Sequence, residues 1–179
     1  MLVIDLFSGL GGFSEAFFQR GHEVMRIEID QKFKDVPNTI IADVRNLPFR
    51  ANLRPDVLLM SPPCIEFCKE SMPWTRTGNH PDMTLFEACL EAVKYFNPMW
   101  WILENVRGAA KYFKPYLGKY QKRCGPYYLW GRFPIFWTEV KKRKMSFPGQ
   151  KPELRSKIPF DLSFNLCYAI ETYSINYAK

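Results

Sequence analysis

Five short apolar runs without polar alternation limit most strongly how this chain can fold. They occupy residues 2–7, 24–29, 40–41, 55–60 and 99–103. Strands that are apolar on both faces are typical of parallel sheets, whose crossover connections cover both sides with helices. Helical spacing follows the first run and recurs at residues 82–96 and 162–170. The pattern therefore predicts an α/β fold with a mostly parallel sheet and helices on both faces.

The length of the chain leaves room for one such sheet and little more. With 179 residues, we expect a single minimal domain over 1–179. Its parts would be a core at 1–110, a basic segment at 111–157 and a closing helix at 158–179. No uncharged apolar run approaches a membrane span. The start has an acid at its fifth position and no basic leader, so it does not resemble a signal peptide, and we expect an intracellular protein without a membrane partner.

The five cysteines are an odd number without the spacing of a disulfide framework, as is typical of reduced thiols inside a cell. A zinc site needs a closed set of ligands. Cys64 and Cys68 have no matching second pair, and His22 and His80 stand alone in the sequence. We therefore predict no metal site and interpret Cys68 as a small buried thiol, with a redox or zinc role for the Cys64 and Cys68 pair as the alternative.

Positive charge is concentrated in one stretch. Residues 107–157 hold 14 Lys and Arg against two acids, a net charge of +12, whereas the remainder carries 11 bases and 16 acids, a net charge of −5. A basic segment on a mildly acidic domain indicates a polyanion partner, and nucleic acid is the leading candidate. The residues that we single out for nucleic-acid binding are Arg76, Arg107, Lys141, Lys142, Arg143 and Lys144.

Polar residues follow the ends of the predicted strands. In an open parallel sheet, ligands bind at the carboxyl ends of the strands. The stretch 5–12 contains a glycine loop at Gly9, Gly11 and Gly12, and Glu28 ends the second run. Glycine lets the backbone approach a ligand closely, and an acid at the second strand is placed to bind a ribose. Loop and acid suggest a nucleoside cofactor, with a tight turn and a surface carboxylate as the alternative interpretation.

A thiol and an acid follow two further strands. Pro62 and Pro63 fix the backbone that presents Cys64, and Glu104 ends the next apolar run. A thiol and a carboxylic acid at adjacent strand ends make a plausible nucleophile and proton donor.

In this order, the motifs Asp5-Leu-Phe-Ser-Gly-Leu-Gly-Gly12, Glu28-Ile-Asp30, Asp43, Pro62-Pro-Cys64 and Glu104-Asn-Val106 resemble those of the cytosine-5 DNA methyltransferases over the first 110 residues. The resemblance implies a Rossmann-like fold, S-adenosylmethionine as cofactor and C5 of cytosine in DNA as methyl acceptor. It also implies a cytoplasmic or nucleoid-associated location. Cofactor contacts would come from Asp5, Phe7, Ser8, Gly9, Gly11, Gly12, Glu28, Ile29, Asp43, Val44, Pro62 and Ser156.

The resemblance also implies how the reaction proceeds. Cys64 would add to C6 of the ring so that C5 becomes nucleophilic, and Glu104, kept protonated by a dry site, would bond to N3. In a duplex the cytosine must first be flipped out of the stack. Arg123 or Arg132 would provide the arginine that contacts the base, and the sequence does not decide between them.

The chain departs from the family in having no separate target-recognition region. Alternative acceptors are therefore single-stranded DNA, RNA or a free cytidine nucleotide. A partner protein or a second copy of the chain is the alternative source of recognition. A non-catalytic nucleic-acid-binding module that keeps the fold is the third interpretation.

Overall fold

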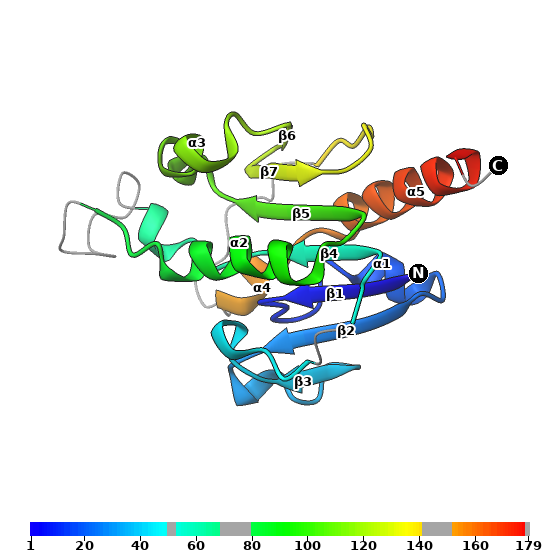
Figure 1. Ribbon diagram of the computed structural model, residues 1–179, viewed down its shortest axis with the longest axis horizontal. Helices are drawn as coiled ribbons and strands as arrows, with labels where there is room; N and C mark the ends of the chain where they lie inside the picture. Colours follow the sequence, from blue (N-terminus) through cyan, green and yellow to red (C-terminus); the bar gives the residue numbers. More distant parts are fainter. Residues whose placement is uncertain (50–52, 69–79, 141–151, 178–179) are drawn as a thin grey trace.

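The computed structural model describes residues 1–49, 53–68, 80–140 and 152–177. Across these residues, the chain forms one seven-stranded sheet (Figure 1) with the order β3-β2-β1-β4-β5-β7-β6. The strands are β1 (Leu2–Leu6), β2 (Glu23–Glu28), β3 (Thr39–Ile41), β4 (Val57–Met60), β5 (Trp100–Asn105), β6 (Lys122–Cys124) and β7 (Tyr127–Arg132).

The first five strands are parallel, and β7 pairs antiparallel with both β5 and β6. The mostly parallel sheet predicted from the apolar runs is confirmed, and each of the five runs forms a strand. Residues 127–132 form β7, which is joined to β6 through a turn at Gly125, whose φ is +61°.

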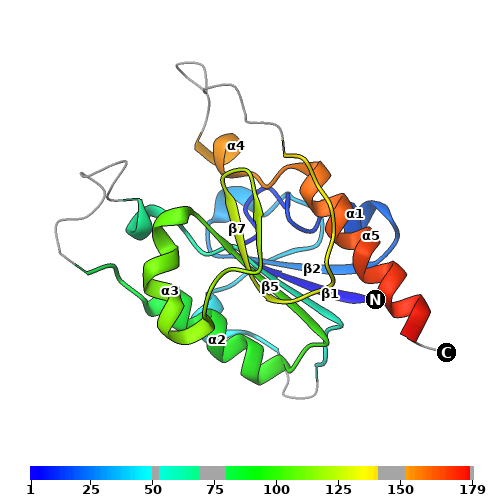
Figure 2. The ribbon, with the colours of Figure 1, turned by 90° about the horizontal axis from the view of Figure 1, so that it is seen from above.

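Helices cover both faces of the sheet. They are α1 (Glu15–Gln19), α2 (Thr84–Phe96), α3 (Ala110–Leu117), α4 (Pro152–Ser156) and α5 (Phe160–Tyr177). Seen from above, α2 and α3 lie on one side of the strands, and α1 and α5 lie on the other (Figure 2). Two hydrophobic clusters, one on each face, follow the alternation of the strands: Val3 and Leu59 belong to one, and Ile4 and Leu58 to the other.

The helix α1 ends in a turn that starts the return to β2. Gly21 has a φ of +83°, its N–H donates to the carbonyl of Phe18, and the N–H of His22 donates to that of Phe17. This pair of bonds is a Schellman motif, which needs a left-handed residue and so favours glycine.

A polar contact ties this turn to α5. Arg20 donates to both carboxylate oxygens of Glu171 at 2.6–3.0 Å, and Nε2 of His22 lies 2.8 Å from Glu171 Oε1. Cys167 lies within 4.8 Å of this pair. The sequence left His22 isolated, because its partners are about 150 positions away. Arg20 already occupies the carboxylate, so we interpret the cluster as a tie between α1 and α5.

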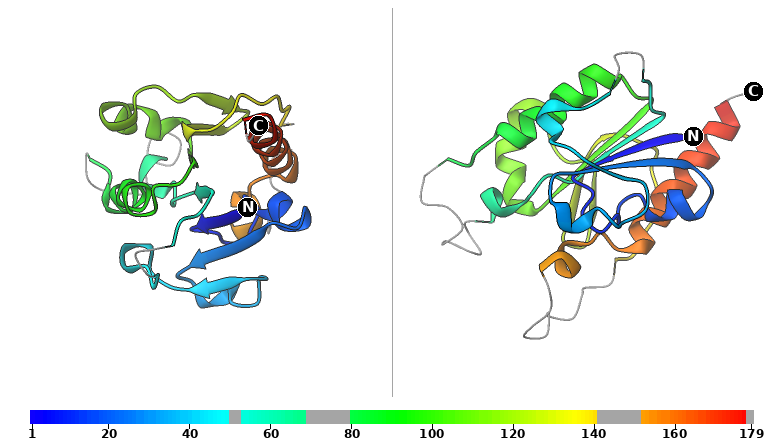
Figure 3. Two further views of the ribbon diagram at one scale, coloured as in Figure 1. Left: turned by 45° about the vertical axis from the view of Figure 1, so that its right-hand side comes forward. Right: turned by 90° about the horizontal axis from the view of Figure 1, so that it is seen from below.

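The carboxyl ends of the parallel strands lie at one edge of the sheet. The start of β1 and the end of α5 lie at the opposite edge, as Figure 3 shows in its right-hand view. Among the described helices, none is both long and apolar enough to cross a bilayer.

Candidate active site

The loop that follows β1 takes an unusual backbone path. Phe7, Gly9 and Gly11 all have positive φ, at +61°, +50° and +71°. A phenylalanine in this region is uncommon, and such strain concentrates at functional sites. A Cβ added at Gly9 would have no neighbouring atom within 4 Å among the described residues, so the space beside Gly9 is open. A Cβ added at Gly11 would lie 2.6 Å from the side chain of Arg26.

A buried polar network supports the loop from below. Arg26 is 1% exposed and donates to Ser14 Oγ at 2.9 Å and to the carbonyl of Pro37 at 2.8 Å. Ser14 in turn donates to Asp5 Oδ2 at 2.6 Å. Burial raises the pKa of Asp5 to about 6, although Ser14 and Arg26 act in the opposite direction. Asp5, predicted as a cofactor contact, is therefore fully buried and holds the network that supports the loop.

Within the part of the chain that the structure describes, two buried side-chain oxygens here lack a hydrogen-bond partner: Ser8 Oγ in the loop, next to Gly9, and Asp5 Oδ1 in β1. Buried polar atoms are seldom left unpaired in folded proteins. An unpaired oxygen next to an open glycine indicates a place where a polar ligand belongs.

Glu28 joins the loop to the end of β2. Its carboxylate accepts the N–H groups of Gly9 at 2.8 Å, Ile29 at 2.9 Å and Asp30 at 3.1 Å. Since a carboxylate offers about four acceptor positions, about one remains for a ligand hydroxyl. Beside it, the apolar side chain of Ile29 is 60% exposed, as a surface that packs against a flat ring would be.

The next acid along the sheet is engaged by its own turn. Asp43 caps the 3₁₀ turn η2 (Val44–Asn46) and forms a bidentate pair with Arg45, whose N–H groups lie 2.6–3.0 Å from the carboxylate. The hydrogen bonds from Arg45 lower the pKa of Asp43 below its usual value. Val44 behind it is buried. A ligand amino group at Asp43 would have to share the carboxylate with Arg45.

The ends of β4 and β5 meet in register. Met60 pairs with Leu103, so the residues that follow face one another. Ser61 Oγ donates to Glu104 Oε2 at 2.5 Å, and the amide of Asn105 donates to the carbonyl of Pro62 at 3.0 Å. Pro62, predicted as a cofactor contact, is thereby fixed to the end of β5.

The thiol of Cys64 comes to the same place. It precedes the 3₁₀ turn η3 (Ile65–Phe67) and is half-buried. Burial, together with contacts from Cys68 and Glu104, raises the pKa of Cys64 to about 12. Burial also raises the pKa of Glu104 to about 7, against the lowering effect of Ser61. The thiol is thus protonated at neutral pH, and the carboxyl group is poised between its two forms.

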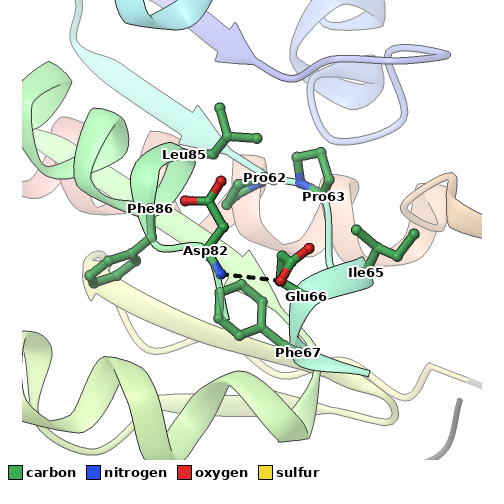
Figure 4. Close-up of a pocket in the computed structure, with 8 residues that line it drawn as sticks. All are labelled: Pro62, Pro63, Ile65, Glu66, Phe67, Asp82, Leu85 and Phe86. Atoms are coloured by element: carbon green, nitrogen blue, oxygen red, sulfur yellow. Dashed lines mark hydrogen bonds between the residues drawn. The ribbon is translucent and has the colours of Figure 1, made fainter. Parts of the chain in front are cut away.

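A cavity of about 150 Å³ lies beside this turn (Figure 4). Figure 4 shows Pro62 and Pro63 facing Leu85 at the start of α2, and the N–H of Asp82 donates to Glu66 at 3.1 Å. Sequence reasoning missed Leu85 and Asp82, because no local motif marks a helix start that packs against a distant turn.

The segment before α5 returns to the glycine loop. A Cβ at Gly12 would lie 2.6 Å from the carbonyl oxygen of Ile158, and α4 lies beside the loop in Figure 1. Ser156 ends α4, where its hydroxyl donates to the carbonyl of Glu153. The chain thus brings Ser156 near the loop.

The two candidate arginines lie level with opposite ends of β5. Arg123 pairs with Tyr128, which pairs with Asn105 at the carboxyl edge. Arg132 pairs with Trp101 at the start of β5 and donates to the carbonyls of Pro98 and Met99. Because β7 runs antiparallel to β5, Arg132 at the end of β7 lies beside the start of β5, away from Glu104. Of the two candidates, only Arg123 lies level with the end of β5.

Of the residues predicted to bind nucleic acid, Arg107 lies in an exposed 3₁₀ turn directly after β5, η5 (Arg107–Ala109). The others fall outside the described residues. These are Arg76, Lys141, Lys142, Arg143 and Lys144.

Comparison with known proteins assigns the fold and the family. A family model described as C-5 cytosine-specific DNA methylase matches residues 1–116. Type II methyltransferase M1.HphI of Haemophilus parahaemolyticus is 28% identical over 175 residues, which cover 89% of this chain and 45% of that protein. Type II methyltransferase M.DdeI of Desulfomicrobium norvegicum is 33% identical over 121 residues, covering 60% and 28%. This chain therefore spans less than half the length of these curated relatives.

A solved structure shares the fold. The T. thermophilus 16S rRNA N2 G1207 methyltransferase RsmC, in complex with AdoMet and guanosine, aligns with a TM-score of 0.51 at 17% identity, covering 73% of this chain and 34% of that chain. The predicted Rossmann-like methyltransferase sheet is thereby confirmed. The family model covers the glycine loop, the Cys64 turn and the end of β5, and the chain belongs to the C-5 cytosine-specific DNA methylase family.

Proposed function

We propose that this protein transfers a methyl group from S-adenosylmethionine to C5 of cytosine in DNA. One observation carries the proposal: the strand register brings a protonated thiol, Cys64, and a buried carboxyl group, Glu104, to adjacent strand ends. A nucleophile and an acid side by side are what addition to an electron-poor ring requires. We infer an intracellular location from the DNA acceptor.

The loop after β1 fits the cofactor. S-adenosylmethionine supplies an electrophilic methyl group when it is bound. Ser8 provides an unpaired buried hydroxyl, Gly9 leaves open space, and Glu28 keeps an acceptor position for a ribose hydroxyl. The exposed Ile29 offers an apolar surface to the adenine.

Cys64 and Glu104 would act on the cytosine as a pair. The sulfur forms a bond to C6 while the proton of Glu104 moves to N3, and the ionised Glu104 accepts the proton that Cys64 releases. C5 then carries the electron pair that attacks the methyl group. In the last step the C5 proton is lost to water and Cys64 leaves C6; Glu104 gives its proton to the departing sulfur and takes the N3 proton in exchange, so that both side chains return to their protonated forms.

The test is transfer of labelled methyl from S-adenosylmethionine to duplex DNA, single-stranded DNA, RNA and deoxycytidine monophosphate, read out as 5-methylcytosine by mass spectrometry. We expect label in DNA and none with Cys64→Ala. Label confined to RNA or to the nucleotide would overturn DNA as acceptor. Cofactor binding without label on any acceptor would favour a non-catalytic module, or a chain that needs a partner or a second copy for recognition.

The same test separates the two roles at the site. Cys64→Ser keeps the size of the side chain but provides a far weaker nucleophile, so it should bind cofactor like the wild type and lose transfer. If Cys64→Ser retained most of the activity, the covalent role of Cys64 would be wrong.

A further inference from the structure

A second pocket, of about 440 Å³, lies beside the site and is not used by the chemistry at Cys64. Its walls come from the η5 turn, the start of α3 and the β6–β7 hairpin. They consist of Arg107, Gly108, Ala110, Lys111, Tyr120, Arg123 and Tyr128.

Among the described residues of the lining, three are cations and none is acidic. Arg107, Lys111 and Arg123 are all exposed and come from three different elements, yet they line one pocket. An anion between converging positive charges is attracted to all of them at once. The electrostatics of the pocket therefore favour an anionic ligand.

Two aromatic residues of the lining contact each other. Tyr120 and Tyr128 contact edge to face, with centroids 4.8 Å apart. The guanidinium of Arg123 lies 5.5 Å from the centre of the Tyr128 ring, and its Nε donates to the carbonyl of Gly125 at 3.0 Å. These contacts fix the direction of the guanidinium, so less side-chain entropy is lost when a ligand binds.

The pocket lies next to the reacting groups. Arg107 is three residues beyond Glu104, and the ladder from Asn105 to Tyr128 to Arg123 crosses two strand spacings, about 10 Å in all. A Cβ at Gly108 would lie 1.9 Å from the carbonyl oxygen of Phe67, so the pocket wall is also in contact with the turn that follows Cys64.

We propose that this pocket binds a backbone phosphate of the polynucleotide that carries the target cytosine, with Arg107, Lys111 and Arg123 as its cations. The proposal rests on the proposed function, since the cytosine at Glu104 defines which strand is bound. A phosphodiester and the phosphate of a free nucleotide share this chemistry. The spread of the cations over three elements favours the continuous strand.

The test is the salt dependence of binding of a fluorescent cytosine-containing oligonucleotide, measured by anisotropy between about 50 and 200 mM salt. Loss of the one phosphate contact should reduce the slope of log K against log salt by up to about 0.7 for a single strand or about 0.9 for a duplex. We expect this reduction for Arg107→Gln and for Lys111→Ala. Arg107→Lys, which keeps the charge, should retain the slope.

Lys114→Ala is the matched control, because Lys114 is an exposed cation of the same helix that does not line the pocket. A wild-type slope for this variant supports the pocket. An equal reduction for Lys114→Ala and Lys111→Ala would overturn it in favour of a diffuse charged face, and so would unchanged slopes in the pocket variants. Thermal unfolding of each variant checks that it is folded.

Deoxycytidine monophosphate serves as competitor for the other source of phosphate. If it displaces the oligonucleotide from the wild type but not from Arg107→Gln/Lys111→Ala, the pocket binds a nucleotide and the polynucleotide proposal is wrong. Methyl transfer is measured separately. Reduced salt slopes in the pocket variants, without methyl transfer by the wild type, would contradict the proposed function alone. Methyl transfer with unchanged slopes in the pocket variants would contradict the phosphate pocket alone.

Discussion

Burial acts in the same direction on both reactive side chains of the site. It raises the pKa of Glu104 to about 7 and that of Cys64 to about 12. A carboxyl group with this pKa donates and accepts a proton near neutral pH with little cost, which is what exchange with a thiol and a ring nitrogen demands. The hydrogen bond from Ser61 opposes the rise, so the burial of Glu104 at the end of β5 is the dominant cause.

We predict that Glu104→Gln flattens the pH dependence of stability. In the folded protein Glu104 keeps its proton up to about pH 7, whereas the unfolded chain releases it near its ordinary value of 4.5. The folded state therefore binds more protons between these values, and its stability is lost as pH rises through about 7. The contribution is about 3 kcal/mol, to be measured by urea unfolding at pH 5 and pH 8.

Asp5 titrates in a similar range but is present in both proteins, so the comparison isolates Glu104. An equally steep fall in Glu104→Gln would show that the carboxyl group is not the source of the pH dependence.

At the scale of elements, two short turns hold the thiol against the acid. The η3 turn follows Cys64, the η5 turn follows β5, and they touch backbone to backbone at Phe67 and Gly108. The backbone of Gly108 is not left-handed, so its conformation alone would accept other residues. The close approach of Phe67 is the reason that position 108 requires glycine.

We predict that Gly108→Ala destabilises the protein by about 3 kcal/mol and lowers methyl transfer, because the added methyl would lie 1.9 Å from the carbonyl of Phe67. Gly118→Ala is the control: its φ of +72° is strained for alanine, but no atom lies within 4 Å. It should cost about 1 kcal/mol. Equal losses in chemical denaturation would refute the role of the contact.

On the scale of the whole molecule, the last helix completes the core on one face of the sheet. Leu162, Leu166 and Ile170 of α5 are fully buried in the same cluster as Val3 of β1. Ser163 adds a polar link, since its hydroxyl donates to the carbonyl of Phe13 at 2.7 Å and accepts the N–H of Ala16 at 3.1 Å. The two ends of the described chain therefore pack into the same hydrophobic cluster.

We predict that Leu166→Ala lowers the free energy of unfolding by about 3 kcal/mol, since it leaves a cavity between α5 and the sheet. Ile175→Ala on the same helix should cost less than about 1 kcal/mol, because Ile175 is 66% exposed. Urea denaturation measures both changes in the free energy of unfolding. If the two substitutions cost the same, α5 does not pack as described.

Local pattern was sufficient for the strands and for the edge at which the site forms. Apolar runs mark β1 to β5, and parallel strands necessarily bring the residues after them to one edge, so Glu28, Cys64 and Glu104 were predictable without knowing the strand order. The sequence also determined the glycine loop, because only glycine accepts that backbone path without strain.

What only the tertiary structure decided depends on long-range pairing. Because β7 is antiparallel to β5, Arg132 lies beside the start of β5, whereas Arg123 of β6 lies level with the end of β5 that carries Asn105. The burial of Asp5 beside Arg26, the contact between Gly108 and Phe67, and the convergence of cations from η5, α3 and β6 likewise join distant residues. Periodicity records which face of an element is apolar, but strand direction and side-chain partners are set by packing between elements, which no local window of sequence contains.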